Sequence, residues 1–201
     1  MKSEFFGYVL AGGKSSRMGT NKAWLKLASG ETFLERSVNN LKTVCGNRVK
    51  VVISNKQFDQ FSQRFPAFDY IFDVLPERGA LGGIHAALLD CAADFAVVLA
   101  VDLPLVKDRT LENLARLALS KNVAAVVPAQ TDGRPQPLAA VYRVKGCLSP
   151  LEDFLNERDS ASARGFLRRL DSVCFAPQNE LSDDERVFFN VNRPEDFAAV
   201  E

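Results

Sequence analysis

The feature that most constrains the fold of this chain is a series of short apolar runs, each of which ends at a polar residue. Residues 49–53 and 95–101 are apolar almost throughout and do not alternate with polar residues. Strands of this composition are buried on both faces, as in parallel sheets that helices cover. Segments with helical spacing of apolar residues separate the runs, so the sequence predicts a doubly wound α/β sheet.

The remaining elements continue this alternation. Further strands are expected at residues 8–10, 70–72, 123–127, 173–176 and 188–192, with another that ends at Tyr142. Helices are expected after the caps Thr32 and Asp108, at residues 56–64, 150–157 and 163–170, before Cys91 and from Pro194. The length suits one domain over residues 1–201. We expect three layers, α/β/α, with a mostly parallel central sheet and a small antiparallel addition in the C-terminal third.

The composition limits the partners. Lys and Arg together number 25, as do Asp and Glu, so there is no general basic field that would hold nucleic acid or an anionic membrane. No apolar stretch approaches the roughly 18–20 residues of a membrane span, and the N-terminus lacks a signal-peptide core, so we expect a cytoplasmic protein. The four cysteines lack metal-ligand spacing and are expected to be reduced and buried, and the single histidine, His85, gives little support to a Ser-His-Asp mechanism.

A glycine-rich segment follows the first predicted strand. The apolar run of residues 8–10 ends abruptly in Ala11, Gly12 and Gly13. Adjacent glycines let backbone N–H groups approach a ligand closely, as a phosphate cradle requires. The next nine residues include three cations, Lys14, Arg17 and Lys22. The spacing matches neither G-x-x-x-x-G-K-[ST] nor G-x-G-x-x-G, so the segment predicts an anion site of another kind, with an ordinary strand-to-helix turn as the alternative.

Polar residues at the ends of three later strands are further candidates. Asn55 and Asp73 come after the second and third strands, and Asp102 follows the strand at 95–101. In open parallel sheets, ligands bind beyond the carboxyl ends of the strands. A carboxylate there suits Mg²⁺, which takes one or two carboxylates and completes its shell with water and phosphate. The alternative for each residue is a turn position before the next helix.

Two segments in the last third have a different pattern. Arg134 and Gln136 stand between prolines in GRPQPL, which favours a rigid, exposed polar edge that could hold a second substrate. In the predicted strand at 188–192, Asn190 and Asn192 alternate onto one face.

Five separated stretches resemble the molybdenum cofactor guanylyltransferases. They are LAGGKSSRMG with Lys22, GALGGI, Asp102-Leu103-Pro104, GRPQPLAAVY and FNVNRPEDF, and together they span nearly the whole chain. The first stretch is common to a larger nucleotidyltransferase group, whereas GRPQPL and N-x-N-x-P-E-D select this family. The resemblance implies a Rossmann-like fold and a Mg²⁺-dependent transfer of GMP from GTP to the phosphate of molybdenum-molybdopterin, with release of pyrophosphate.

The resemblance also implies a role for each matching residue. GTP binding falls on Leu10, Ala11, Gly12, Gly13, Lys22, Asn55, Asp73 and Asp102, and Asp102 is also the Mg²⁺ ligand. The residues expected to act in catalysis are Arg17, Lys22 and Asp102. Acceptor binding falls on Arg17, Gly79, Gly83, Asn190 and Asn192, with Arg134 and Gln136 as weaker candidates. Besides GTP and molybdenum-molybdopterin, cofactor-biosynthesis or molybdoenzyme-delivery proteins are candidate partners.

Two positions depart from the family pattern. Asn21 replaces the usual acidic residue before the loop lysine, which removes a charge that could orient Lys22. GALGGI has Ala80 in place of proline and Gly82 in place of alanine, which predicts a looser loop. Two alternatives stay open: a related cytidylyl- or nucleotidylyltransferase that acts on another phosphorylated cofactor or small molecule, and a nucleotide-binding protein without catalysis.

Overall fold

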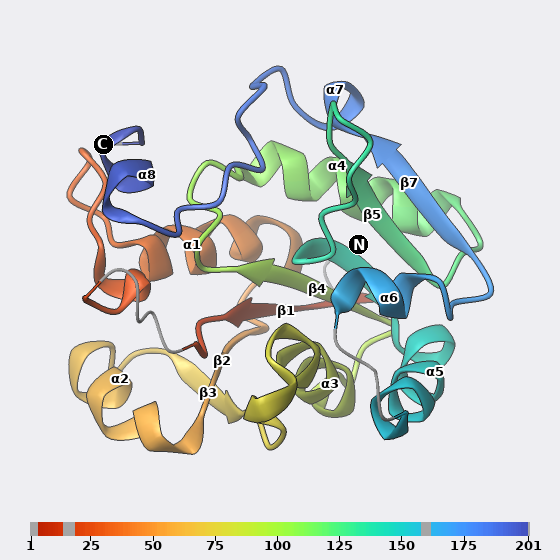
Figure 1. Ribbon diagram of the computed structural model, residues 1–201, viewed down its shortest axis with the longest axis horizontal. Helices are drawn as coiled ribbons and strands as arrows, with labels where there is room; N and C mark the ends of the chain where they lie inside the picture. Colours follow the sequence, from red (N-terminus) through yellow and green to blue (C-terminus); the bar gives the residue numbers. More distant parts are fainter. Residues whose placement is uncertain (1–3, 14–18, 158–161, 201) are drawn as a thin grey trace.

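A computed structural model describes residues 4–13, 19–157 and 162–200, and its centre is a seven-stranded sheet (Figure 1). The order across the sheet is β3-β2-β1-β4-β6-β5-β7. The strands are β1 (Phe5–Leu10), β2 (Val49–Ile53), β3 (Asp69–Phe72), β4 (Phe95–Ala100), β5 (Ala125–Ala129), β6 (Ala139–Arg143) and β7 (Val173–Pro177). All neighbours pair in parallel except for β6, which is antiparallel to both β4 and β5. The predicted mostly parallel sheet with a small antiparallel addition is confirmed.

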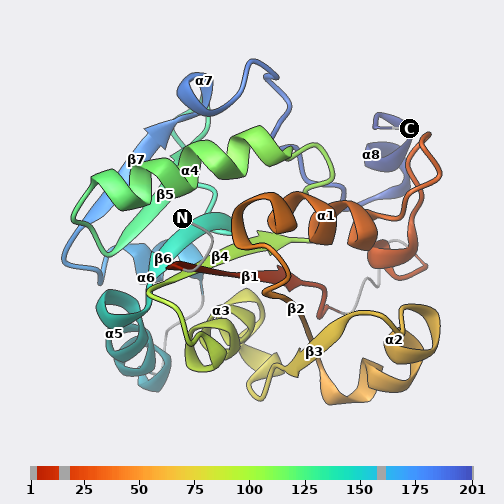
Figure 2. The ribbon, with the colours of Figure 1, turned by 180° about the vertical axis from the view of Figure 1, so that it is seen from behind.

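Helices cover both faces of this sheet. α1 (Phe33–Cys45) and α4 (Asp108–Ser120) lie on one face, and α3 (Ala80–Asp90) and α5 (Val144–Asn156) lie on the other, as Figure 1 and Figure 2 show from opposite sides. The shorter helices are α2 (Phe58–Arg64), α6 (Ala163–Leu167), α7 (Gln178–Leu181) and α8 (Pro194–Ala198), and the 3-10 helices are η2 (Lys22–Trp24), η3 (Asn55–Gln57) and η4 (Pro76–Arg78). The three-layer α/β/α arrangement is therefore confirmed.

Two apolar clusters explain why the central strands are apolar throughout. Val97 belongs to the cluster under α1 and α4, whereas its neighbour Val98 belongs to the cluster under α3 and α5. Successive side chains of a strand point to opposite faces, and here both faces are buried. β3 lies at the edge of the sheet and is only partly buried, which agrees with its shorter apolar run.

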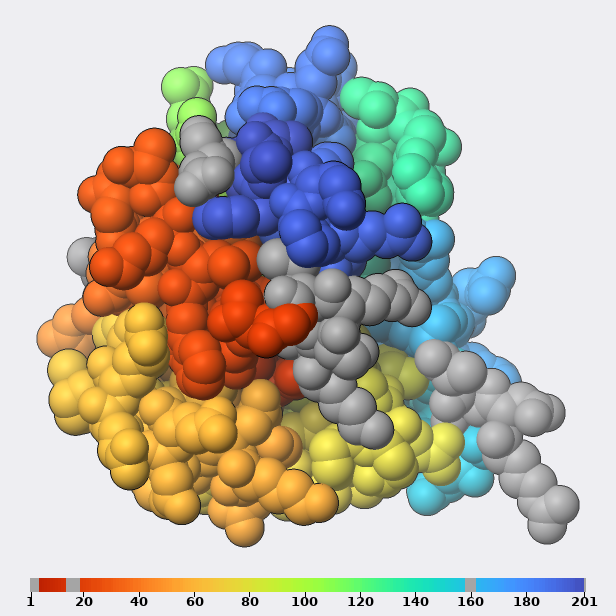
Figure 3. All heavy atoms as spheres, turned by 60° about the vertical axis from the view of Figure 1, so that its left-hand side comes forward, coloured from red at the N-terminus to blue at the C-terminus, as the bar shows by residue number. Residues whose placement is uncertain are grey.

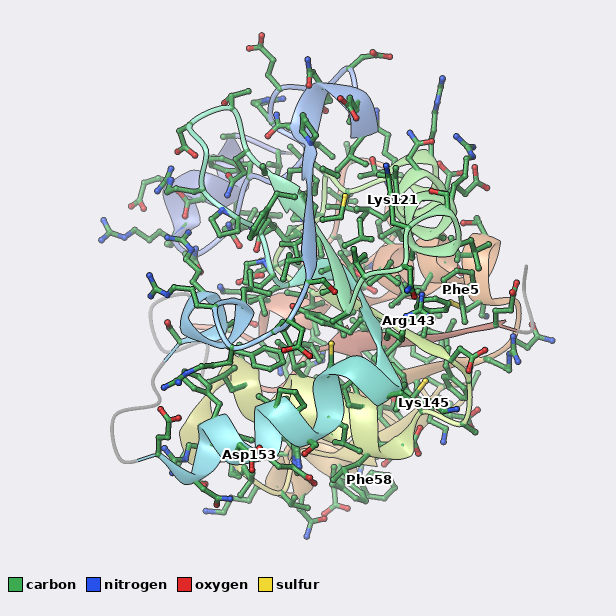
Figure 4. All side chains as sticks on the ribbon, turned by 90° about the vertical axis from the view of Figure 1, so that its right-hand side faces the viewer. Phe5, Phe58, Lys121, Arg143, Lys145 and Asp153 are labelled. Carbon is green, nitrogen blue, oxygen red and sulfur yellow. The ribbon has the colours of Figure 1, made fainter. Side chains whose placement is uncertain are left out.

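The amino ends of the strands are closed by aromatic packing. Phe5 and Phe95 stack with their ring centroids 5.3 Å apart, and the Arg143 guanidinium lies 4.6 Å from the Phe95 centroid. Arg143 also donates to the Val123 carbonyl at 3.2 Å, so its charge is engaged at this end of the sheet (Figure 4). The carboxyl ends of β1 and β4 are the open side of the sheet.

The expected cap of α1 is present. Thr32 Oγ1 accepts from the Glu35 N–H at 3.2 Å, and the Glu35 carboxylate accepts from the Thr32 N–H at 2.8 Å. The Glu35 carboxylate also accepts from the Thr32 hydroxyl at 2.7 Å, and this bond, together with the one from the Thr32 N–H, holds the pKa of Glu35 below its ordinary value. Such reciprocal capping satisfies two backbone donors that the first turn leaves unpaired.

The predicted strand at residues 188–192 is wrong. Residues 185–188 form a turn, in which Val187 N–H donates to the Asp184 carbonyl and Phe189 N–H to the Arg186 carbonyl, and residues 189–192 have no regular structure. Phe188 and Val191 are the buried residues of the segment, and their spacing of three does not fit the period of two that a strand requires. Asn190 and Asn192 are therefore not placed by strand alternation.

Several boundaries also differ from expectation. Asp108 is the first residue of α4 and Lys107 occupies the cap position, and β5 begins two residues later than predicted. α5 begins at Val144 and includes Pro150, whereas the helix was expected to begin at this proline, and α6 ends at Leu167 instead of continuing to residue 170. All four cysteines are free; two of them are buried, Cys45 and Cys147, and the other two are partly exposed, which corrects the expectation of four buried thiols. In the described part of the chain, no helix has the length and apolar composition that crossing a membrane requires.

Candidate active site

The site lies where the direction of strand succession reverses. From β1 the chain continues to β2 and β3 on one side, and β4 pairs with β1 on the other. Beyond β1, the N–H groups of Ala11 and Gly12 both donate to the Val52 carbonyl at 3.0 Å. Beyond β4, Val101 N–H donates to the Leu10 carbonyl at 3.1 Å. Ligands of open α/β sheets bind in the crevice at such a switch point.

Two adjoining cavities open at this end of the sheet. The smaller, which we call the phosphate cavity, measures about 330 Å³ and is lined by Leu10, Ala11, Gly12, Gly13, Lys22, Asp73, Gly79, Gly83 and Asp102 together with Val52, Ala80, Ala100, Val101 and Leu138. The larger, which we call the nucleoside cavity, measures about 1530 Å³ and lies toward β2 and β3. Four lining residues are common to both cavities, namely Gly12, Gly13, Asp73 and Gly79. A ligand longer than a phosphate group could therefore occupy both.

Lys22 is held in place by two acceptors. Its Nζ donates to Asp102 Oδ2 at 3.1 Å and to Asn192 Oδ1 at 2.7 Å. Asn21 caps η2, with its side-chain oxygen accepting from the Ala23 N–H at 3.0 Å. The charge that Asn21 lacks was expected to affect the orientation of Lys22, but Asp102 and Asn192 orient this lysine.

Asp102 is the residue that could bind a metal ion. Its Oδ2 pairs with Lys22, whereas its Oδ1 is buried and has no hydrogen-bond partner among the described residues. Within residues 4–13, 19–157 and 162–200, no three His, Cys, Asp or Glu side chains gather as a metal site would require. A Mg²⁺ ion fits this arrangement if substrate phosphates and water supply most of its ligands.

Asp73 lies against the first turn of α3. Its Oδ1 accepts from the Leu75 N–H at 2.8 Å. Burial raises the pKa of the Asp73 carboxyl, although the bond from Leu75 and the proximity of His85 act in the opposite direction. A Cβ on Gly82 would lie 2.3 Å from the Leu75 carbonyl oxygen and 2.5 Å from Asp73 Oδ1. GALGGI is therefore not a loose loop: Gly82 and Gly83 belong to the first turns of α3, and the glycine lets the carboxylate approach the helix.

The acceptor-side candidates are only partly brought together. Gly79 and Gly83 line the phosphate cavity, and Asn192 reaches it through Lys22. Asn190 is half-buried and donates to the Phe188 carbonyl at 3.4 Å. Arg134 is exposed and pairs with Asp132 of its own turn. Arg17 lies outside the described residues.

The expectation of an exposed edge at Gln136 is wrong. Gln136 is only 6% exposed, and its backbone N–H donates to the Pro128 carbonyl at 2.9 Å. The prolines do prevent a helix here. Pro135 forms an antiparallel bridge with Ala129, the last residue of β5, so the segment packs against the sheet and the Gln136 side chain is buried.

Sequence reasoning missed most of the nucleoside cavity. Trp24, Ser54, Gln57 and Phe72 line it beside Asn55. Ser54 and Gln57 bond each other, since Gln57 Oε1 accepts from both the N–H and the hydroxyl of Ser54 at 3.0 and 2.8 Å. Their spacing of three, as in a capping box, was a signal available in the sequence. Phe72 stood in a predicted strand, where nothing distinguished it from a core residue.

A model of the MobA-like NTP transferase domain matches residues 7–173. The chain belongs to this family. Over 193 residues it is 34% identical to a protein of Geobacillus sp. (strain WCH70) named "Probable molybdenum cofactor guanylyltransferase", with 95% of each chain covered. It is 33% identical over 195 residues to a Bacillus subtilis (strain 168) protein of the same name, covering 96% of this chain and 92% of the relative. The crystal structure of molybdopterin-guanine dinucleotide biosynthesis protein A from Archaeoglobus fulgidus superimposes with a TM-score of 0.81 at 29% identity, covering 97% and 96% of the two chains. As a member of the MobA-like NTP transferase family, the protein is a nucleotidyltransferase.

Proposed function

We propose that the protein is a molybdenum cofactor guanylyltransferase, which transfers GMP from GTP to the terminal phosphate of molybdenum-molybdopterin. The observation that supports this most is the phosphate cavity, where the glycine segment after β1, Lys22 and Asp102 come together at the switch point of the sheet. The names of the relatives in the family supply the two substrates. The cytoplasmic location and the delivery partners expected from the sequence stay predictions.

The two cavities suggest how GTP is placed. The nucleoside cavity is lined by Asn55, Asp73 and the exposed ring of Phe72, which offer hydrogen bonds and an apolar surface to a base and ribose. Gly12 and Gly13 border both cavities, so the triphosphate would pass along their backbone to Lys22. The acceptor phosphate would then enter beside Asp102 from the side of Gly79 and Gly83.

The reaction needs positioning more than a covalent nucleophile. An oxygen of the acceptor phosphate forms a bond to the α-phosphorus of GTP, and the bond from that phosphorus to the bridging oxygen breaks, so the electron pair leaves with pyrophosphate. The attacking phosphate is already an anion at neutral pH, and no general base is required. Lys22 would stabilise the charge that develops on the departing pyrophosphate. When bound at Asp102, Mg²⁺ would neutralise charge on the reacting phosphates.

Nucleotide preference and acceptor dependence test this function. Each of the four nucleoside triphosphates is offered with Mg²⁺, with and without molybdenum-loaded molybdopterin, and released pyrophosphate is measured. We expect release with GTP alone among the four and only when the acceptor is present. Lys22→Ala is the matched control, and it should lower the rate on the order of 10²-fold because a cation next to the phosphates is lost.

The other outcomes identify the alternatives. Release with CTP would indicate a cytidylyltransferase, and release with GTP and another phosphorylated acceptor would reject molybdenum-molybdopterin as the substrate. Nucleotide binding without pyrophosphate release under every condition would indicate a binding protein without catalysis.

A further inference from the structure

The C-terminal segment, by which we mean residues 184–200, reaches the phosphate cavity through the side chain of Asn192. This side chain accepts from Lys22 Nζ at 2.7 Å, and the preceding Val191 N–H donates to the Asp102 carbonyl at 2.9 Å. Val191 is fully buried, which fixes the backbone next to Asn192. Figure 3 shows these C-terminal residues, in dark blue, against the orange residues of the first part of the chain. Two residues proposed to act on the phosphates are thus bonded to one distant segment.

Asp196 holds this segment in its conformation. Its Oδ2 accepts from the backbone N–H groups of both Asn192 and Arg193 at 2.8 Å. These two bonds, helped by the charges of Arg193 and Lys22, hold the pKa of Asp196 below its ordinary value. α8, which contains Asp196, is itself attached to α1 where the rings of Phe197 and Phe33 meet edge to face at 5.9 Å.

We propose that Asp196 is a positioning residue that, through Asn192, holds the Lys22 ammonium in the phosphate cavity. The inference deepens the proposed function, and its kinetic consequence rests on that function. A lysine stem is flexible, so its ammonium needs fixed acceptors if it is to be preorganised for an anion. Asp102 is one acceptor, but in the proposed reaction this carboxylate also binds the metal.

Asn192 therefore has a role that a carboxylate could not fill. Its neutral amide oxygen fixes the direction of the Lys22 ammonium without neutralising the charge that the phosphates need. Asp196 places its own negative charge one step further away, on the backbone of the segment instead of on the lysine.

Chemical reactivity of Lys22 in the ligand-free protein tests the positioning directly. Acetic anhydride is the probe, and acetylation of Lys22 is followed by mass spectrometry of the full chain after digestion. In Asp196→Ala the lysine should react roughly fivefold faster, the factor expected for loss of about one hydrogen bond. Asp184→Ala is the matched control, because Asp184 Oδ1 accepts from the Arg186 N–H at 2.8 Å in the same segment but has no bond toward Lys22. Asp196→Asn keeps an acceptor oxygen and should restore the slow rate.

A result that overturns the proposal is an unchanged rate in Asp196→Ala, or an equal rise in Asp184→Ala. Asn192→Ala is the second variant, and it should give the same rise without changing Asp196. Melting temperatures are measured alongside, so that a general loss of stability is recognised in any variant.

A double-mutant cycle gives the kinetic readout. Asp196→Ala should lower kcat for pyrophosphate release roughly fivefold in the wild-type background and have no effect in the Lys22→Ala background. Equal losses in the two backgrounds would mean that Asp196 acts only on the fold, which overturns the proposal. If the wild-type protein transfers no nucleotide, the proposed function fails, whereas the acetylation rates still decide whether Asp196 positions Lys22.

Discussion

Gly82→Ala should destabilise the protein and disturb the nucleotide site together. The added Cβ would lie 2.3 Å from the Leu75 carbonyl oxygen, a backbone atom, and 2.5 Å from Asp73 Oδ1. Normal contacts between these atom types need roughly 1 Å more, so either η4 or the start of α3 must shift. Overpacking of this kind costs about 1–3 kcal/mol, and the better helix propensity of alanine returns at most about 1 kcal/mol.

The clash is with a backbone atom, which places the cost in the upper part of that range, so the expected net loss is about 1–2 kcal/mol of unfolding free energy. For a chain of this size, that corresponds to a fall of roughly 2–8 °C in melting temperature. Because the Asp73 carboxylate borders both cavities and must move, the KM for GTP should rise as well. Differential scanning fluorimetry and steady-state pyrophosphate release measure the two effects.

Gly13→Ala is the control for stability. It adds the same methyl group where no atom of the described residues lies within 4 Å, so its melting temperature should stay at or above that of the wild type. A Gly82→Ala protein as stable as the wild type, with an unchanged KM for GTP, would refute the close approach of Asp73 to α3.

Four other changes have expected outcomes. Asp102→Ala should abolish Mg²⁺-dependent pyrophosphate release while the circular dichroism spectrum is retained, and an active variant would reject the metal role. Burial raises the pKa of Asp73, so the charged carboxylate destabilises the folded state at pH values above that pKa. Asp73→Asn should therefore raise the melting temperature at pH 7. This increase in melting temperature should vanish as the pH falls below 3.8, the ordinary pKa of the carboxyl group. Thr32→Ala removes the α1 cap and should cost about 1 kcal/mol by urea unfolding. Burial raises the pKa of Cys45 and of Cys147 to about 12, so a thiol reagent at pH 8 should label these two only after unfolding in guanidinium.

The residues that line the phosphate cavity also explain why a chain with a single histidine can be a nucleotidyltransferase. The chemistry needs a cation beside the phosphates and a carboxylate for the metal, and among the described residues the phosphate cavity is lined by Lys22, Asp73 and Asp102. His85 is part of α3 and lines neither cavity. Its Nε2 lies 3.6 Å from Oε1 of Glu152 on α5.

The sequence by itself determined the layered fold and the open end of the sheet. Apolar runs such as β4, and β2 apart from Lys50, are typical of strands that are covered on both faces, and composition reports this burial directly. The same holds for Gly12, Gly13 and Asp102, because the end of a strand is visible in the sequence and parallel strands present their ends at one edge.

Only the tertiary structure decided which distant residues meet. Lys22 and Asn192 are 170 positions apart, and no periodicity relates them. The sequence predicts an exposed edge at Gln136, which is buried, and a strand at 188–192, where the chain leaves a turn and continues without regular structure. Both errors have one cause: side-chain patterns report local conformation, whereas the path of an irregular segment depends on the surface against which it packs. For Gly82, likewise, the sequence showed a missing methyl group, and the structure showed that Asp73 and Leu75 occupy its place.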